Sequence, residues 1–549
     1  MTYPRFPLEQ RAVSSYDPLR GETVRILHLY VAPGAALADD ANSGSQALPL
    51  ATFDGLMRRL RLLDRVGSDA PLIVHLESAA YSWSVPLDDL KLRAPAVIVC
   101  DGAGQDGDDG TTVLRGPSAA AAGSTTSSVV DPDGGMTVNS LQGRTIQMLT
   151  GAAAGEFRTI RNNTATAIVP VYPFSAIAEG DSFRVFEPGA VITTPASANA
   201  GALGRHDPLI SGIGTPADTQ GTSGEQRQSW SPSTLLLVNL TFTDDNTSAL
   251  QQWLSIASSA VALAGVLFRS TRAVGFWVIQ NDETSQLIAG CDQPLPVSGF
   301  AEFVLPYQLG LLGVGGLFAL CDSPTKWTGW AVGIVDDTQP VTFSPRRFSG
   351  FMVYQANFSG ASGPITRSAQ WVLYGGEFNS DVDGATVSSR VWHITDQSAV
   401  LILPASTSIP FRVIGTGSSN NAAAIEVTGS SRLASQDLTV ELAGSGCGIA
   451  AAAAQSVADV WKEPGRVSLV RRNVIDAPRS LVVALLGGQV SWDEPPTTTV
   501  VPSVGEAVIT QSSIGGAAVA PSPATFAGIA DGVVVVNPDG SGTMLRRVT

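Results

Sequence analysis

Acidic residues recur where short apolar runs end, between residues 234 and 486. Cleavage of a glycosidic bond needs one carboxyl group as acid and a second as base or nucleophile. Successive turns of a solenoid can align such side chains on one face, although ordinary polar corner residues would show the same pattern. The candidate catalytic residues are Asp244, Asp245, Asp282, Glu283 and Asp336, and similar positions hold Asp337, Glu377, Asp381 and Asp383.

Aromatic residues of the same region can stack on sugar rings, because their faces are apolar and their edges carry polar groups. Packing at a solenoid surface or between subunits would use the same residue types. The candidate ligand-binding residues are Trp327, Trp330, Trp371, Tyr374 and Trp392.

Signatures of other chemistries are missing from the sequence. It contains no G-x-S-x-G, H-E-x-x-H or P-loop motif, which argues against a serine hydrolase, a zinc protease or an NTPase. A G-x-G-x-x-G pattern starts at Gly102, but residues 108–112 (Asp-Asp-Gly-Thr-Thr) follow it instead of a helix. Dinucleotide binding is therefore not expected.

Metal sites and cofactors are not expected either. The four cysteines form no C-x-x-C pair, and we expect small buried thiols. The acidic loop between Asp101 and Asp109 fails the EF-hand pattern and predicts a solvated turn. The four histidines are far apart in sequence, so we expect them to have packing roles. They are His28, His75, His206 and His393.

Many short β-prone runs, separated by Gly, Asn or Asp, indicate an all-β fold. The breaks are too short for crossover helices, and many runs are apolar at consecutive positions. Strong runs recur at roughly 20–30 residues, as in solenoids. We interpret this as a right-handed parallel β-helix with asparagines at its corners, such as Asn281 and Asn379. A two-domain β-sandwich is the alternative.

Composition supports a rigid β-rich protein that works outside a cell or on a particle. Charged residues make up only 15% of the 549 residues, and there are 56 glycines. The net charge of −15 argues against nucleic-acid binding. The first ten residues hold no apolar stretch, so we expect no secretory signal, and no run of 18 apolar residues predicts membrane insertion.

A capping helix is predicted just after residue 52. Thr52 can cap it, Asp54 favours its first turn, and Phe53, Leu56 and Met57 begin an apolar face that Leu60 and Leu63 continue. Such a helix would cover the open end of a solenoid, where unpaired backbone groups are exposed.

Residues 24–104 resemble the N-terminal part of pectin-lyase-like β-helix proteins. In that family a strand leads to a polar turn, a Pro-x-x-Thr helix start, a Gly-x-Tyr element and a strand ending in x-Gly-x-Gly. Ala80 stands where the family usually has glycine before the tyrosine. The matching residues are Asp40, Asn42, Ser43, Gly44, Pro49, Thr52, Tyr81, Gly102 and Gly104.

Residues 143–186 have a different strand texture, with a glycine-bounded hairpin predicted at 151–155. They are similar to short β-barrel modules of phage-tail proteins. The motif residues are Leu149-Thr-Gly151, Gly155, Arg158-Thr-Ile160, Asn163-Thr-Ala-Thr166 and Gly180-Asp-Ser-Phe183.

The expected organisation has six parts. The coil would run through 24–104 and 234–486 and be interrupted by the inserted module. The parts are an N-terminal attachment arm (1–22), the β-helix start and cap (23–114), the inserted β-domain (115–190), a long loop (191–233), the main β-helix (234–490) and a C-terminal oligomerisation segment (491–549).

The sequence of the C-terminal segment indicates that the protein self-associates. A terminal hairpin is expected because Asn537-Pro-Asp-Gly540 favours a turn. The four consecutive valines at 533–536 indicate a strand that is buried on both of its faces. A homotrimer would bury this surface around its axis.

Taken together, the sequence predicts a tailspike-like or tail-fibre-like protein on a phage or phage-tail-like particle. It would bind a cell-surface polysaccharide, contact other tail or baseplate proteins through its N-terminal region, and in one version depolymerise the glycan. The alternatives are a free polysaccharide lyase or glycoside hydrolase of the pectin-lyase fold, and a purely structural particle component.

Overall fold

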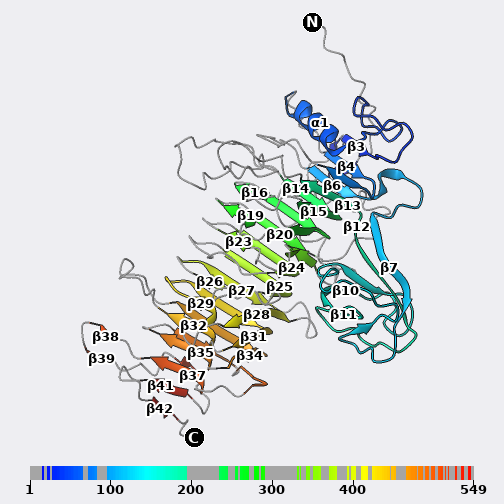
Figure 1. Ribbon diagram of the computed structural model, residues 1–549. Coiled ribbons are helices and arrows are strands. Elements are labelled where there is room, and N and C mark those ends of the chain that lie inside the picture. Colours follow the sequence, from blue (N-terminus) through cyan, green and yellow to red (C-terminus); the bar gives the residue numbers. More distant parts are fainter. Residues whose placement is uncertain are drawn as a thin grey trace. The chain divides into compact units, whose positions relative to one another are not determined.

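The computed structural model shows an all-β protein, as predicted (Figure 1). Its described part contains one α-helix, α1 (Phe53–Arg65), and one 3-10 helix, η1 (Gly102–Gly104). No helix in that part is long and apolar enough to span a membrane. The described residues are 15–17, 22–24, 27–65, 72–82, 96–194, 234–244, 254–257, 260–270, 277–282, 286–290, 330–332, 334–335, 342–345, 350–359, 370–379, 392–394, 397–403, 410–417, 423–444, 447–452, 465–478, 480–485, 489–493, 496–500, 505–510, 513–514, 517–518, 526–527, 533–536 and 542–545.

Two compact units divide the chain, and each is described by itself. The first unit combines residues 1–280 and 285–336, and the second combines 281–284 and 337–549. Small separate sheets are formed by β1 (Ser15–Asp17) with β2 (Glu22–Val24), by β16 (Leu254–Ala257), β19 (Trp277–Asp282) and β23 (Thr342–Pro345), and by β38 (Ser513–Ile514) with β39 (Ala517–Ala518). Strand β21 (Trp330–Val332) belongs to the large parallel sheet.

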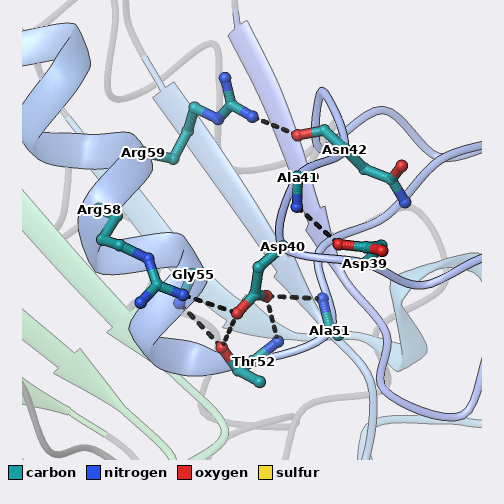
Figure 2. A network of polar contacts seen from close by, with 9 residues as sticks. All are labelled: Asp39, Asp40, Ala41, Asn42, Ala51, Thr52, Gly55, Arg58 and Arg59. Carbon is teal, nitrogen blue, oxygen red and sulfur yellow. Dashed lines mark hydrogen bonds and ion pairs between the residues drawn. The ribbon is translucent and has the colours of Figure 1, made fainter.

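Helix α1 forms as the sequence predicts, because its first turn is capped and one face is apolar. The Thr52 hydroxyl accepts a hydrogen bond from the Gly55 N–H at 2.9 Å, which satisfies one of the free N–H groups of the first turn. Asp40 accepts from Thr52 and Arg58 and so fastens the preceding loop to the helix (Figure 2). The predicted apolar face is buried at Phe53, Leu56, Met57 and Leu60.

Parallel pairing dominates the first unit. One sheet joins strands from distant parts of the chain in the order β3, β4, β6, β14, β17 and β20, and a second joins β5, β13, β15, β18 and β22. Their bounds are β3 (Leu27–Val31), β4 (Leu72–Leu76), β6 (Ala96–Cys100), β14 (Thr234–Val238), β17 (Ala260–Ala264), β20 (Gln286–Gly290), β5 (Ala80–Ser82), β13 (Ala190–Thr194), β15 (Leu240–Asp244), β18 (Leu267–Ser270) and β22 (Ile334–Val335).

An antiparallel sheet lies between β6 and β13 in the chain. Its order is β7-β12-β9-β10-β11-β8, and it encloses a core that includes Ile146, Met148, Phe183 and Val185. β9 and β10 form the predicted hairpin, while β7 crosses the predicted boundary after residue 114. The bounds are β7 (Thr111–Ala119), β8 (Val129–Val130), β9 (Thr145–Met148), β10 (Phe157–Asn163), β11 (Ala167–Pro170) and β12 (Ser182–Pro188).

The second unit contains three runs of parallel strands. One runs β24-β25-β27-β30-β33-β36-β40, a second runs β25-β28-β31-β34, and a third runs β26-β29-β32-β35-β37-β41, whose strands stand in that order in Figure 1. β41 closes in the predicted terminal hairpin with β42.

Buried and partly exposed residues alternate in several strands of this unit, as in β30 and β33. The bounds in this unit are β24 (Gly350–Ser359), β25 (Gln370–Asn379), β26 (Trp392–Ile394), β27 (Ala399–Leu403), β28 (Phe411–Gly417), β29 (Ala423–Val427), β30 (Arg432–Gln436), β31 (Leu438–Gly444), β32 (Cys447–Ala452), β33 (Arg466–Arg471), β34 (Val474–Asp476), β35 (Ser480–Leu485), β36 (Gln489–Trp492), β37 (Gly505–Thr510), β40 (Phe526–Ala527), β41 (Val533–Val536) and β42 (Gly542–Leu545).

Left-handed residues mark sharp bends between consecutive strands. Asn239, Asp437 and Arg472 have φ angles of 55°, 57° and 51° and separate strands that belong to different runs. A single left-handed residue turns the chain without a long loop. The corners predicted at Asn281 and Asn379 are wrong, because these residues lie in β19 and β25.

Candidate functional site

The described residues do not show whether the predicted catalytic acids lie close to one another. Asp244 ends β15 and Asp282 ends β19, so both lie at strand ends as expected, but their side chains lie outside the described part. Asp245, Glu283 and Asp336 lie outside the described residues altogether.

Two of the five predicted sugar-stacking rings are core residues instead. Trp371 and Trp392 are 1% and 0% exposed, and their rings meet edge to face with centroids 5.8 Å apart. Phe378 and Phe411 complete this buried aromatic cluster. Stacking on a ligand needs an accessible face, so these two assignments are wrong for the chain by itself.

The other three predicted rings stay untested. Trp330 belongs to β21 and Tyr374 to β25, but their side chains lie outside the described part, as does all of Trp327.

A ladder of polar side chains runs across β25, β28, β31 and β34 in the second unit. Parallel register places Glu377 beside Arg412 and Arg412 beside Thr439, while Glu441 stands beside Asp476 two residues further along. Arg412, Thr439, Glu441 and Asp476 are partly exposed and lie next to buried residues, so they share the face opposite the core. The register places Glu377 on the same face, although its side chain is buried. We call Glu377, Arg412, Thr439, Glu441 and Asp476 the polar ladder.

The guanidinium of Arg412 lies between two carboxylates of the ladder. Its Nη2 donates to Glu441 Oε1 at 2.5 Å, and its Nη1 lies 3.7 Å from Glu377 Oε2. The Glu377 side chain is only 3% exposed, whereas that of Glu441 is 37% exposed. A buried carboxylate needs such a partner, so Arg412 supports Glu377 and presents Glu441 to the solvent.

Asp476 ends the ladder and holds the next segment of chain. Its carboxylate accepts hydrogen bonds from the Thr499 N–H and hydroxyl at 2.6 and 2.8 Å and from the Thr498 hydroxyl at 3.0 Å. Burial acts to raise the pKa of Asp476, but the hydrogen bonds from Thr499 and Thr498 outweigh it and lower that pKa. Asp476 is therefore ionised at neutral pH.

The partly exposed members of the ladder offer a guanidinium donor at Arg412, a hydroxyl at Thr439 and carboxylate acceptors at Glu441 and Asp476, which suit a polyhydroxylated ligand. Neighbouring strands of a parallel sheet are about 4.8 Å apart. A row with this repeat can contact an extended chain of sugar residues at several points.

Sequence reasoning noticed Glu377 but missed Arg412, Glu441 and Asp476. The local signal was present on β31, because 438–442 alternate apolar and polar residues, but it was weak on β28, where Arg412 is followed by Val413 and Ile414. What the sequence does not contain is the register, which brings residues 27 to 35 positions apart side by side.

The acidic loop near Asp101 was predicted to be a solvated turn, and it makes both a local turn contact and a contact with a residue 30 positions away. The Asp108 carboxylate accepts from the Ser78 N–H and hydroxyl at 2.6 and 2.5 Å, and Asp109 accepts from the Thr111 N–H at 3.0 Å. Across the described residues, no group of acidic, histidine or cysteine side chains is arranged to hold a metal ion.

Comparisons with known proteins found solved structures that are similar to this chain at very low identity and TM-score. No family model and no curated protein matches the sequence. The Gp54 tailspike of Acinetobacter baumannii bacteriophage AP22, solved in complex with A. baumannii capsular saccharide, has 8% identity and a TM-score of 0.28, covering 87% of this chain and 76% of that chain.

Two further structures are similar to the same degree. One is described as a glycoside hydrolase, with 9% identity, a TM-score of 0.22, and coverage of 86% of this chain and 95% of that chain. The other is the GH136 lacto-N-biosidase from Eubacterium ramulus, with 8% identity, a TM-score of 0.26, and coverage of 87% and 67%. TM-scores this low show no close superposition, so the site rests on the chain's own residues.

Proposed function

We propose that this chain binds a cell-surface polysaccharide and that the polar ladder is part of its binding surface. The observation that carries the proposal is the in-register row on β25, β28, β31 and β34, with Arg412 held between Glu377 and Glu441. Polar groups at fixed repeats along one sheet face suit a repeating, hydroxyl-rich ligand.

The architecture that we propose is a right-handed parallel β-helix with the antiparallel sheet inserted as a separate domain. Three features support it: the parallel register of distant strands, the single-residue corners, and the pairing of β6 with β14 across the inserted sheet. The resemblance of residues 24–104 to pectin-lyase-like proteins points the same way.

The setting that we propose is a phage or phage-tail-like particle. The similarity of residues 143–186 to tail modules supports it. The N-terminal arm would then contact tail or baseplate proteins, and the C-terminal segment would hold a homotrimer together.

A second candidate function is glycan cleavage, which needs an acid and a base or nucleophile across one bond. The observation that favours it is that Asp244 and Asp282 end strands β15 and β19. The predicted acids Asp244, Asp245, Asp282, Glu283 and Asp336 stay the proposed catalytic residues for this case. If cleavage is detected and survives an alanine substitution at each of the five in turn, that assignment is wrong.

Binding of the full-length chain to immobilised bacterial capsular polysaccharides and lipopolysaccharides, measured by biolayer interferometry, tests the proposal. We expect at least one glycan to bind. Glu441→Gln should weaken this binding about tenfold, because it removes one charged hydrogen-bond acceptor without disturbing the buried Glu377.

Glu426→Gln on β29 is the matched control, since it makes the same change on a different run of strands. Equal weakening by both variants would mean that the polar ladder is not the binding surface. No binding to any glycan would favour a purely structural role. Release of reducing ends or unsaturated products from a bound glycan would favour the enzyme alternatives.

A further inference from the structure

Two histidines and an aspartate form a hydrogen-bonded chain across the first strands of the parallel sheet. His28 lies on β3, His75 on β4, and Asp101 directly after β6. His28 Nδ1 is 2.9 Å from His75 Nε2, and His75 Nδ1 is 2.5 Å from Asp101 Oδ2. One side chain from each of three neighbouring strands therefore contributes to the chain.

The surroundings of these three hydrogen-bonded residues are aromatic and largely shielded from water. The rings of Tyr30 and His75 are stacked with centroids 4.5 Å apart, and those of His28 and His75 are stacked at 5.2 Å. His75 is 6% exposed, and His28 is half-buried. A proton added here is therefore poorly solvated.

The charges that act on His28 come from His75 and Asp101. Burial lowers the pKa of His28 most, the neighbouring His75 lowers it further, and Asp101 opposes them, so the pKa falls from 6.5 to about 4. His28 is therefore neutral at pH 7.

The hydrogen-bond pattern fixes the tautomers of both rings. An ionised Asp101 can only accept, so His75 carries its proton on Nδ1 and offers a lone pair at Nε2. His28 must then donate from Nδ1, which leaves its Nε2 as a bare acceptor. That atom is buried and has no hydrogen-bond partner in the described structure. We infer this assignment from the donor and acceptor rules.

Acid acts on these three residues at His28 Nε2, the buried acceptor that has no hydrogen-bond partner in the described structure. A proton there places a positive charge on a half-buried ring that is stacked on His75, in surroundings that solvate the charge poorly. The folded arrangement therefore resists this proton, whereas the unfolded chain takes it up freely.

We propose that the Asp101–His75–His28 chain is a pH-sensitive latch, which fastens the first three strands of the parallel sheet at neutral pH and loosens them in acid. The sign follows from linkage. His28 takes up a proton more readily in the unfolded chain than in the folded one, so stability is lost as the pH falls from 6.5 towards 4.

Deuterium exchange at the C2 position of each histidine, followed by mass spectrometry, tests the folded state of the wild-type chain directly. Measurements at pH 5.5 and 8 stay above the isoelectric point of about 4.7. An ordinary histidine exchanges about tenfold faster at pH 8 than at pH 5.5, because it is mostly protonated at the lower pH. We expect nearly equal rates for His28. A tenfold change at His28 would overturn the proposal.

Backbone amide exchange of the peptides that contain β3 and β4 tests the latch itself. After correction for intrinsic rates, protection in the wild-type chain should fall up to about tenfold between pH 7.5 and 5.5. His28→Asn should abolish this dependence, because asparagine can still donate to His75 Nε2 but does not titrate. His393→Asn, on β26 of the other unit, is the control and should behave like the wild type.

A fall in protection of equal size in the wild-type chain and in His28→Asn would also overturn the proposal. If His28→Asn does not fold, the C2 exchange of the wild-type chain still decides the question, since it needs no variant.

Discussion

Single carboxylates stabilise bends of the chain by accepting several hydrogen bonds. Asp40 shows this at the helical cap, where it accepts hydrogen bonds from the Ala51 and Thr52 N–H groups at 3.1 and 2.9 Å and from Arg58 at 2.8 Å (Figure 2). A Cβ at Gly55 would collide with this carboxylate, so the helix can approach it only because residue 55 is a glycine.

Asp40→Ala should loosen the helical cap by about 2 kcal/mol, because several donors lose a charged acceptor at once. Amide exchange of the peptide that covers α1 should become about thirtyfold faster. Asp39→Ala is the matched control, since Asp39 accepts one hydrogen bond from the Ala41 N–H at 2.8 Å and is exposed. Equal acceleration by both substitutions would contradict this role of Asp40.

Elements of this protein are bent by single left-handed residues. Arg472 turns the chain between β33 and β34 at a φ of 51°, and its guanidinium pairs with Asp437, which occupies the corner before β31 at 57°. The left-handed conformation costs a residue with a Cβ about 1–2 kcal/mol of conformational free energy, whereas glycine adopts it without this cost.

Arg472→Val should therefore destabilise the second unit by about 1–2 kcal/mol more than Arg472→Gly does. Both variants lose the ion pair with Asp437, so their difference isolates the backbone conformation. Calorimetry should show a lower melting temperature for the valine variant. Equal melting temperatures would mean that the corner can relax out of the left-handed region.

Elements that depend on local residues could be predicted from the sequence. Helix α1 follows from Thr52 and an apolar face, and the hairpins at 151–155 and at the C-terminus follow from their turn residues. The polar ladder could not be predicted, because its members meet only through long-range register. Trp371 and Trp392 were misassigned because aromatic composition does not reveal which face of a strand is buried.

At the scale of the whole molecule, the C-terminal segment is the part proposed to hold three copies together. β41 consists of four valines and pairs on one side with β37 and on the other with β42. Backbone pairing of this kind leaves the faces of the strand to be covered by side chains of other elements.

Truncation at about Pro496 should therefore convert a trimer into a monomer, measured by light scattering on the full-length and shortened chains. Association in the full-length chain follows from burial of apolar surface around the symmetry axis. A shortened chain that is still trimeric, or a full-length chain that is a soluble monomer, would contradict the proposed role of the segment.

The polar ladder is proposed to contact a polysaccharide. Amide exchange of the full-length chain, with and without a glycan that it binds, locates the contact directly. We predict slower exchange in the peptides that cover β28, β31 and β34 and unchanged exchange in those that cover β9 and β10 of the antiparallel sheet. Binding that slows exchange elsewhere and leaves β28, β31 and β34 unchanged would contradict the account.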